Sequence, residues 1–382
     1  MQTTHTSHIP DRTNRTAHAL TTSQQQKICC CASDLLFIMW TIKLLRVNHV
    51  PKDFREPFIV SGYRSCRSSV SSCIVSAFSW NNETFNFWTH FITFVYFSWI
   101  FTQWLWYELQ FDVDPFTYPL QVYLASVCLY MLVSSTAHLF NCMSERSRHI
   151  FFFFDYGALS IYSLACSILY SSYVFPKCFV NTMYHSVFVP CCVFNALLCT
   201  VLACLSRLVA GLKLQKIFRI ISFSLPYIFC SFPLLYRCIF CQGDDCGHSG
   251  AIELHIYQFI LCTITILIYG THFPEVLAPG RFDIIGHSHQ FFHIISSLAT
   301  YCQLRGNILD MQHRRDYLLS ELPMPTLLNT AGVVVGVLIL NLIIIGIFSG
   351  FIWEKQDLRR VKQKQGILTI GCEASNLQVK QS

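Results

Sequence analysis

The chain has 382 residues, of which 53% are hydrophobic and only 13% are charged. Soluble globular domains carry about 25% charged residues, so this composition excludes an ordinary cytosolic enzyme. The high apolar content also excludes intrinsic disorder, and the length suits seven or eight membrane helices of about 20 residues with their loops. No nucleic-acid-binding pattern accompanies the net charge of +6. We therefore expect no nucleic-acid partner, and the basic residues indicate orientation in a membrane and attraction to anionic lipid.

Residues 1–75 form the predicted cytoplasmic N-terminal region. Residues 1–28 are rich in Thr, Gln and His and contain no apolar signal segment, so this end is expected to stay in the cytoplasm. Cys29, Cys30 and Cys31 precede a short apolar run. Either S-acylation or an ordinary hydrophobic contact would account for these three cysteines.

From residue 84 onwards, long uncharged runs alternate with short polar loops. Eight runs without Asp, Glu, Lys or Arg predict eight transmembrane helices: 84–107, 115–142, 156–176, 178–206, 220–236, 254–274, 284–304 and 322–353. The sequence therefore predicts an all-α integral membrane protein. A seven-helix membrane core would occupy 76–321, an eighth transmembrane helix 322–353, and a basic cytoplasmic tail 354–382.

The basic residues predict the orientation of this bundle. Counted over alternate loops, 22 of the 27 Lys and Arg residues fall on one side, and three of the other five lie in 305–315. The positive-inside rule then places both termini in the cytoplasm. A multi-pass protein of the plasma membrane is the expected location, although an internal membrane would give the same orientation relative to the cytosol.

The 20 Cys residues are scattered through apolar segments, and no CxxC pair suggests a zinc knuckle or a redox site. Most are expected to pack as small apolar side chains. Cys241 and Cys246 lie in one polar loop and form the one plausible disulfide, provided that the loop faces an oxidising compartment.

Histidine and acidic side chains collect at the predicted cytoplasmic ends of the helices. His289 and His293 are four residues apart and share one helix face, so both imidazoles can reach one ion. His138 ends the second predicted span, with Ser134 four residues before it. Three imidazoles leave a fourth coordination position open, as in catalytic zinc sites. Asp155, at the start of the third span, could orient a water molecule at that position and act as its base.

Simpler interpretations compete with a metal site. A single His in a membrane helix is more often an interhelical hydrogen-bond partner than a metal ligand, and an isolated HxxxH pattern is a weak signal. Four further histidines are expected to pack between helices or lie at the interface: His90, His185, His255 and His272. His287 is expected either to cap its helix or to face the inner interface. Glu83 is expected to cap the first helix, and Glu253 and Glu275 are expected to be solvated.

Six motifs, in order between residues 45 and 353, resemble the progestin and adipoQ receptor family. They are Gly62-Tyr63-Arg64, Asn82-Glu83-Thr84-x-Asn86-x-x-Thr89-His90, Ser134-x-x-x-His138, Asp155-Tyr156-Gly157, Ala278-Pro279-Gly280-Arg281-Phe282-Asp283 and Gly286-His287-Ser288-His289-Gln290-x-x-His293. The eighth helix and the string from His272 to Asp283 resemble the membrane progestin receptors within this family, above all the gamma type.

The resemblance implies a seven-helix bundle of the adiponectin-receptor type with an additional C-terminal helix. It implies a receptor that binds a progestin and signals rapidly, by proposal through a G protein. It also implies zinc at His138, His289 and His293, with Asp155 holding the zinc water. The family is similar in arrangement to alkaline ceramidases, so the alternative is a zinc-dependent hydrolase of a sphingolipid amide that uses Asp155 and Ser134. In a third interpretation, zinc only joins two helices. The ligand and the oligomeric state are left open.

Overall fold

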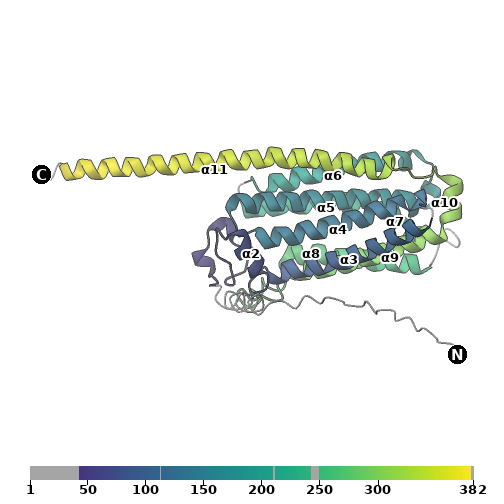
Figure 1. The fold of residues 1–382 in the computed structure, drawn as a ribbon, viewed down its shortest axis with the longest axis horizontal. Coiled ribbons are helices and arrows are strands. Elements are labelled where there is room, and N and C mark those ends of the chain that lie inside the picture. The colour runs from purple at the N-terminus through teal and green to yellow at the C-terminus, as the bar shows by residue number, and fades with distance from the viewer. Residues whose placement is uncertain (1–42, 112, 210, 242–248, 380–382) are drawn as a thin grey trace, which may run out of the picture. The chain divides into compact units, whose positions relative to one another are not determined.

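The computed structural model describes residues 43–379, apart from 112, 210 and 242–248. These residues form helices joined by short turns, and Figure 1 shows the long helices side by side. The α-helices are α2 (Val70–Ser76), α3 (Thr84–Gln110), α4 (Tyr118–Phe140), α5 (Glu145–Tyr173), α6 (Met183–Ser206), α7 (Leu212–Phe240), α8 (Ser249–Thr271), α9 (Ser288–His313), α10 (Arg315–Glu321) and α11 (Val333–Val379). Single turns lie between them: η1 (Val47–His49), η2 (Lys52–Phe54), η3 (Pro115–Thr117), η4 (Lys177–Phe179) and the π-helical η6 (Leu328–Gly332).

Within the described part of the chain, six helices are long and apolar enough to cross a membrane: α4 with η3, α5, α6, α7, α8, and α11 with η6. The all-helical membrane fold predicted from the sequence is therefore confirmed. The other two predicted spans correspond to α3 and α9, which are as long but are not among these six. Both belong to the bundle, since α9 packs along α8 and α3, and α3 along α4. Their crossing of the membrane stays a prediction, as do the domain boundaries and the side on which the termini lie.

Helix α5 begins eleven residues before the predicted span at 156–176. The Ser144 hydroxyl accepts a hydrogen bond from the backbone N–H of Ser147 (3.0 Å) and so caps the helix at this earlier point. Arg148 in the added turns forms an ion pair with Glu56. Asp155 therefore lies in the third turn of α5, and its expected position at the start of the helix was wrong.

Helix α5 is the central helix of the bundle. In its most apolar segment 72% of the residues are buried, against 22% in α8 and 17% in the stretch that contains α11. It packs against α4, α6 and α11. The contact with α11 is close at Gly157, where a Cβ atom would lie 3.0 Å from Ile345 Cδ1. A buried hydrogen bond from Asn341 Nδ2 to Ser160 Oγ (2.7 Å) links the two helices at the same level.

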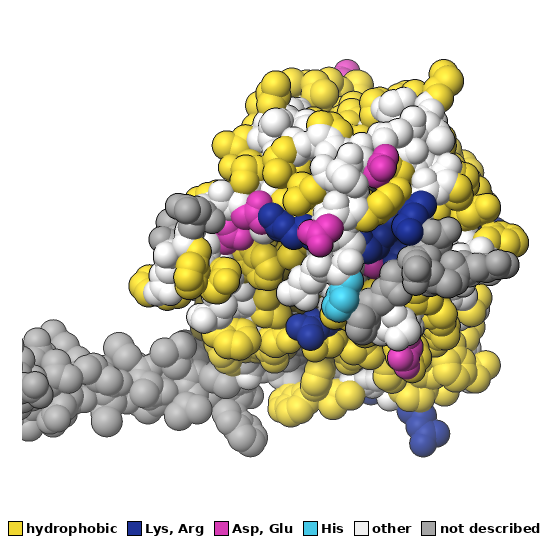
Figure 2. All heavy atoms as spheres, turned by 90° about the vertical axis from the view of Figure 1, so that its right-hand side faces the viewer, with side chains coloured by type: hydrophobic (Ala, Val, Ile, Leu, Met, Phe, Trp, Pro, Cys, Tyr) yellow, Lys and Arg dark blue, Asp and Glu magenta, His cyan; other side chains and the backbone are white. Residues whose placement is uncertain are grey.

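Charged side chains gather in the middle of the end face where α10 lies, with hydrophobic side chains around them (Figure 2). An ion pair of Asp114 and Arg315 (2.6 Å) joins η3 to α10 at this end. Along the flanks, large apolar side chains such as Trp99, Ile228 and Ile343 are more than half exposed. A polar end and apolar flanks are what a lipid-embedded helical bundle requires.

Most described cysteines agree with the expected packing role. Free cysteines are buried at eight positions: Cys73, Cys142, Cys166, Cys192, Cys199, Cys204, Cys230 and Cys302. Cys241 is disulfide-bonded. Cys246, its expected partner, lies outside the described residues, as do Cys29, Cys30 and Cys31.

Candidate metal centre and ligand cavity

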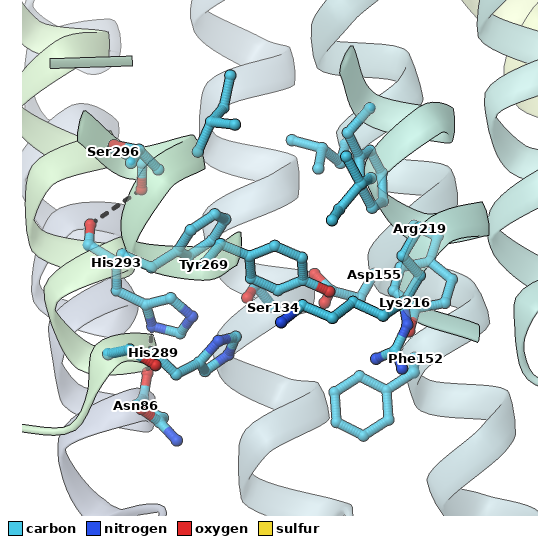
Figure 3. Close-up of a pocket in the computed structure, with 18 of the residues that line it drawn as sticks. Asn86, Ser134, Phe152, Asp155, Lys216, Arg219, Tyr269, His289, His293 and Ser296 are labelled. Atoms are coloured by element: carbon cyan, nitrogen blue, oxygen red, sulfur yellow. Dashed lines mark hydrogen bonds between the residues drawn. The ribbon is translucent and has the colours of Figure 1, made fainter. Parts of the chain in front are cut away.

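Three histidines converge at the end of the bundle where α2 lies. His138 is in the last turn of α4, while His289 and His293 lie on one face at the start of α9. One nitrogen of each ring lies within 4.8 Å of the other two, and the Nε2 atoms of His138 and His289 are 3.1 Å apart. Figure 3 shows His289 and His293 side by side at the edge of the cavity. In a tetrahedral zinc site with bonds of about 2.0–2.1 Å, two nitrogen ligands lie about 3.3 Å apart.

Hydrogen bonds behind the rings hold two of these imidazoles in place. His138 Nδ1 lies 2.8 Å from Glu83 Oε2. His293 Nδ1 lies 3.1 Å from the backbone oxygen of Asn86 and 3.1 Å from Thr89 Oγ1. An imidazole whose Nδ1–H is donated in this way offers its Nε2 lone pair to a metal. The donor set of three imidazoles, with a carboxylate behind one of them, fits a zinc ion that keeps one position open.

Glu83 was expected to cap α3, but its carboxylate makes no cap hydrogen bond. It accepts hydrogen bonds from Asn86 Nδ2 (2.8 Å) and Asn141 Nδ2 (2.7 Å) in addition to its contact with His138. Burial raises the pKa of Glu83, but neighbouring His138 and Arg64 and the hydrogen bonds lower it by more, to well below its usual range. Arg64 in turn donates to the backbone oxygen of His138 (2.7 Å) and to Asn141 Oδ1 (2.7 Å).

The sequence predicted neither this role of Glu83 nor the contacts of Arg64. The sequence signal for these contacts was that the two motifs before and at the start of α3 contain a basic residue, Arg64, and an acidic residue, Glu83. Spacing along the chain does not reveal that they meet, because Arg64 lies in the segment before α3 and bonds to the end of α4.

Ser134 and Asp155, the two predicted catalytic residues, lie beside the histidines. Ser134 is one turn before His138 on α4 and is 4% exposed. Its hydroxyl lies beside the carboxylate of Asp155 on α5. Both side chains line the same cavity as the three histidines, and Figure 3 shows them together behind it. The structure thus brings all five predicted site residues together, while their roles in binding and catalysis stay predictions.

The cavity beside the histidines has a volume of about 980 Å³ and extends into the bundle between α3, α4, α5, α7, α8 and α9. Lys216 and Arg219 on α7 face the histidines across it, together with Tyr269 on α8 (Figure 3). Deeper in the bundle its walls are largely apolar and aromatic. A polar cluster lines the deep part, where Gln303 Oε1 accepts from Tyr162 Oη (2.5 Å) and Gln303 Nε2 donates to Tyr170 Oη (2.6 Å).

Two of the remaining predictions about acidic residues had different outcomes. Glu253 is exposed, as expected. Glu275 was expected to be solvated, but this was wrong, because it is 3% exposed and accepts hydrogen bonds from the backbone N–H of Ser288 (2.6 Å) and from the Ser288 hydroxyl. Burial raises the pKa of Glu275, but contacts from His272 and Ser288 outweigh this effect and lower it.

His255 belongs to a buried ionic cluster far from the three histidines. Its Nε2 lies 2.9 Å from Asp310 Oδ2, and the guanidinium of Arg237 bonds to both carboxylate oxygens of Asp310 (2.6 and 2.8 Å). All three side chains are fully buried. The cluster joins α7, α8 and α9, so His255 packs between helices as expected and also contacts a buried ion pair of Arg237 and Asp310.

Comparison with known proteins gives consistent matches over the membrane core. A family model described as "Haemolysin-III related" matches residues 78–304, which include all five site residues. "Membrane progestin receptor gamma-A" of Danio rerio is 44% identical over 327 residues, covering 80% of this chain and 94% of that protein. "Membrane progestin receptor gamma-B" of Danio rerio is 41% identical over 324 residues, covering 80% and 93%. "Membrane progestin receptor gamma" of Homo sapiens is 38% identical over 314 residues, covering 82% and 94%.

Proposed function

Because the chain belongs to the progestin and adipoQ receptor family, we propose that it is a plasma-membrane receptor that binds a progestin in the cavity beside the three histidines. The names of its relatives support the receptor assignment. The observation that carries the ligand assignment is the cavity itself, whose volume of about 980 Å³ lies at the upper end of the range of small-molecule pockets. In this proposal the receptor also signals rapidly, through a G protein.

The chemistry of the cavity suits a steroid. Its deeper walls include Leu159, Ala299 and Ile266, which can cover an apolar ring system, and polar side chains are concentrated near the histidines and near Gln303. Burial of apolar surface contributes roughly 25 cal/mol per Å². A fused ring system also loses little conformational entropy when it binds, so little of the favourable free energy from this burial is offset.

We further propose that His138, His289 and His293 hold a zinc ion. The support is the donor set and the hydrogen bonds that orient His138 and His293 from behind. When bound, zinc acts as a Lewis acid towards an oxygen atom near it, and it also links α4 to α9. Glu83, Asn86 and Thr89 keep the imidazoles in the orientation that this binding needs.

The receptor function is tested by measuring progesterone binding to membranes that contain the chain. Saturable binding that unlabelled progestins displace is expected, and its absence would refute the proposal. Ala299→Phe fills the cavity from α9 and should abolish binding while zinc content stays the same. Leu298→Phe adds the same ring at the neighbouring position, which is 50% exposed on the outside of the helix, and should bind as the wild type does.

A second candidate function is hydrolysis of a ceramide-like amide, and the position of Ser134 and Asp155 next to each other and beside the histidines favours it. In this reaction water adds to the amide carbon while Asp155 takes up its proton. The C–N bond then breaks, and the proton passes to the leaving amine, which releases sphingosine and a fatty acid. Purified protein should release sphingosine from ceramide, and Asp155→Asn should not. Equal release by both proteins would indicate a contaminant and would exclude the hydrolase.

A further inference from the structure

His90 on α3 occupies an unusual position at the wall of the cavity. It is 3% exposed and stacks on His293, with ring centroids 3.6 Å apart and an angle of 10° between the planes. The rings of His90 and Tyr130 are perpendicular to each other, with centroids 6.1 Å apart. His90, His293 and Tyr130 all line the cavity. These contacts hold the imidazole in one orientation, which is the condition for directional recognition of a ligand.

Neither ring nitrogen of His90 has a hydrogen-bond partner among the residues that the structure describes. A neutral imidazole carries one N–H donor and one acceptor nitrogen. Burying both without partners is costly, and buried polar groups are nearly always paired. The other histidines nearby differ in this respect, since Glu83 faces His138, the Asn86 carbonyl faces His293, and the Asn82 carbonyl faces His287. His90 lines the cavity, so a molecule taken up there can supply the partner once a neighbouring side chain moves aside, since both nitrogens are buried in the present arrangement.

That partner is not the ion proposed for the three histidines. A metal bonded to His293 would lie in the plane of the His293 ring, because the nitrogen lone pair lies in that plane. The parallel ring of His90 is displaced by about the stacking distance of 3.6 Å, so its own lone pair does not point at the same ion. In agreement with this, the group of mutually close ligand atoms contains His138, His289 and His293 without His90.

The rest of the cavity indicates what kind of molecule supplies the partner. Gln303 lies ten residues beyond His293 on α9, which is about 15 Å along a helix, and its partners Tyr162 and Tyr170 are on α5. The hydroxyl groups between them on α9 are already bonded, since Ser296 donates to the His293 carbonyl and Thr300 to the Ser296 carbonyl. A ligand that fits this arrangement has a rigid apolar body and a hydrogen-bonding group at each end.

We propose that His90 donates a hydrogen bond to a carbonyl group at one end of the bound steroid and thereby determines ligand specificity, with the other end of the steroid near Gln303. This inference rests on the proposed receptor function. It adds that recognition of the polar end is made by a histidine outside the metal cluster.

The test compares progesterone with two analogues, one lacking the ring ketone and the other lacking the side-chain ketone. Wild-type protein should bind the analogue without the contacted carbonyl about 3- to 10-fold more weakly than progesterone, in line with the net contribution of one neutral hydrogen bond. His90→Phe keeps the stacked ring and removes both nitrogens. It should weaken progesterone binding by the same factor and abolish the difference between progesterone and that analogue. His90→Gln, which keeps a donor, should restore part of the difference.

His185→Phe is the matched control, because His185 is half-buried on α6, contacts Ser171 and does not line the cavity. It should leave all three affinities unchanged, and zinc content should be the same in every variant. If His90→Phe weakens progesterone and both analogues equally, or changes none of them, His90 only packs or meets water and the inference is overturned. Absence of any steroid binding to the wild type would instead overturn the receptor function, and this inference with it.

Discussion

Replacement of Glu83 by Gln tests whether the hydrogen bonds behind the histidines hold a metal site. The substitution keeps the shape of the side chain but removes the negative charge that faces His138 Nδ1 at 2.8 Å. Replacing a partner behind a metal ligand costs about 10- to 100-fold in metal affinity, which is about 1.4–2.7 kcal/mol. We expect a value near the upper limit. Glu83 is 6% exposed, so water does not replace its charge, and nearby Arg64 would lose its compensating carboxylate.

The assay is a competition between purified protein in detergent and a zinc chelator of known affinity, with bound zinc measured by elemental analysis. Glu108→Gln provides the matched control, because Glu108 is on the same helix, is 7% exposed and accepts a hydrogen bond from the backbone N–H of Asp114 (3.2 Å). It lies near the opposite end of α3 from the histidines. Glu108→Gln should therefore retain zinc with wild-type affinity, whereas Glu83→Gln should release it at a lower chelator concentration.

Two results would refute this reasoning. One is wild-type zinc affinity in a folded Glu83→Gln protein, which would mean that the carboxylate does not support His138 as a ligand. The other is an equal loss of zinc in Glu108→Gln, which would show that any buried charge on α3 acts through general stability. Thermal unfolding with excess zinc present separates a folding defect from weaker binding.

Two further predictions concern the ionic cluster of α7, α8 and α9. Asp310→Asn leaves the buried charge of Arg237 without its carboxylate and should lower the free energy of unfolding by about 3–5 kcal/mol in detergent; the double variant Arg237→Met with Asp310→Leu should lose less, and an equal loss would contradict the ionic explanation. Gly306→Ala places a Cβ atom 2.8 Å from Cε1 of the His255 ring and should cost about 1–3 kcal/mol, measured in the same way. Gly346→Ala, where no atom lies within 4 Å of the added Cβ, should cost nothing comparable.

The sequence predicted which segments form the membrane helices better than it predicted where they end. Uncharged runs identify residues that can lie in lipid, but a helix continues wherever its polar side chains find partners. Helix α5 starts at Glu145 because Ser144 caps it and Arg148 pairs with Glu56. Helix α7 likewise starts at Leu212, eight residues before the predicted span at 220–236, and Lys216 in its second turn donates a hydrogen bond to the backbone oxygen of Gly270 on α8. These partners come from other segments, so no local pattern contains them.

The residues of the candidate site were predictable for a different reason. His289 and His293 share a face through their spacing alone, and His138 could be placed at the same depth because it ends an apolar run. The environment of Glu275 could not be predicted in this way. Its burial depends on how the segment between α8 and α9 folds back so that the carboxylate reaches the N–H of Ser288, and that conformation follows from tertiary contacts.

The buried polar groups of this chain differ in whether their partners belong to the protein. Both carboxylate oxygens of Asp310 are bonded to Arg237 or His255 within the bundle, and none of these three residues lines the cavity, so the cluster serves to hold three helices together. His90 is as well buried and lines the cavity, yet its nitrogens find no partner among the described residues. An unpaired polar group inside a membrane bundle has a free-energy cost. A ligand therefore accounts for the position of His90, and folding accounts for the cluster around Asp310. Loss of stability without a change in ligand preference is therefore expected at Asp310, and a change in ligand preference without loss of stability at His90.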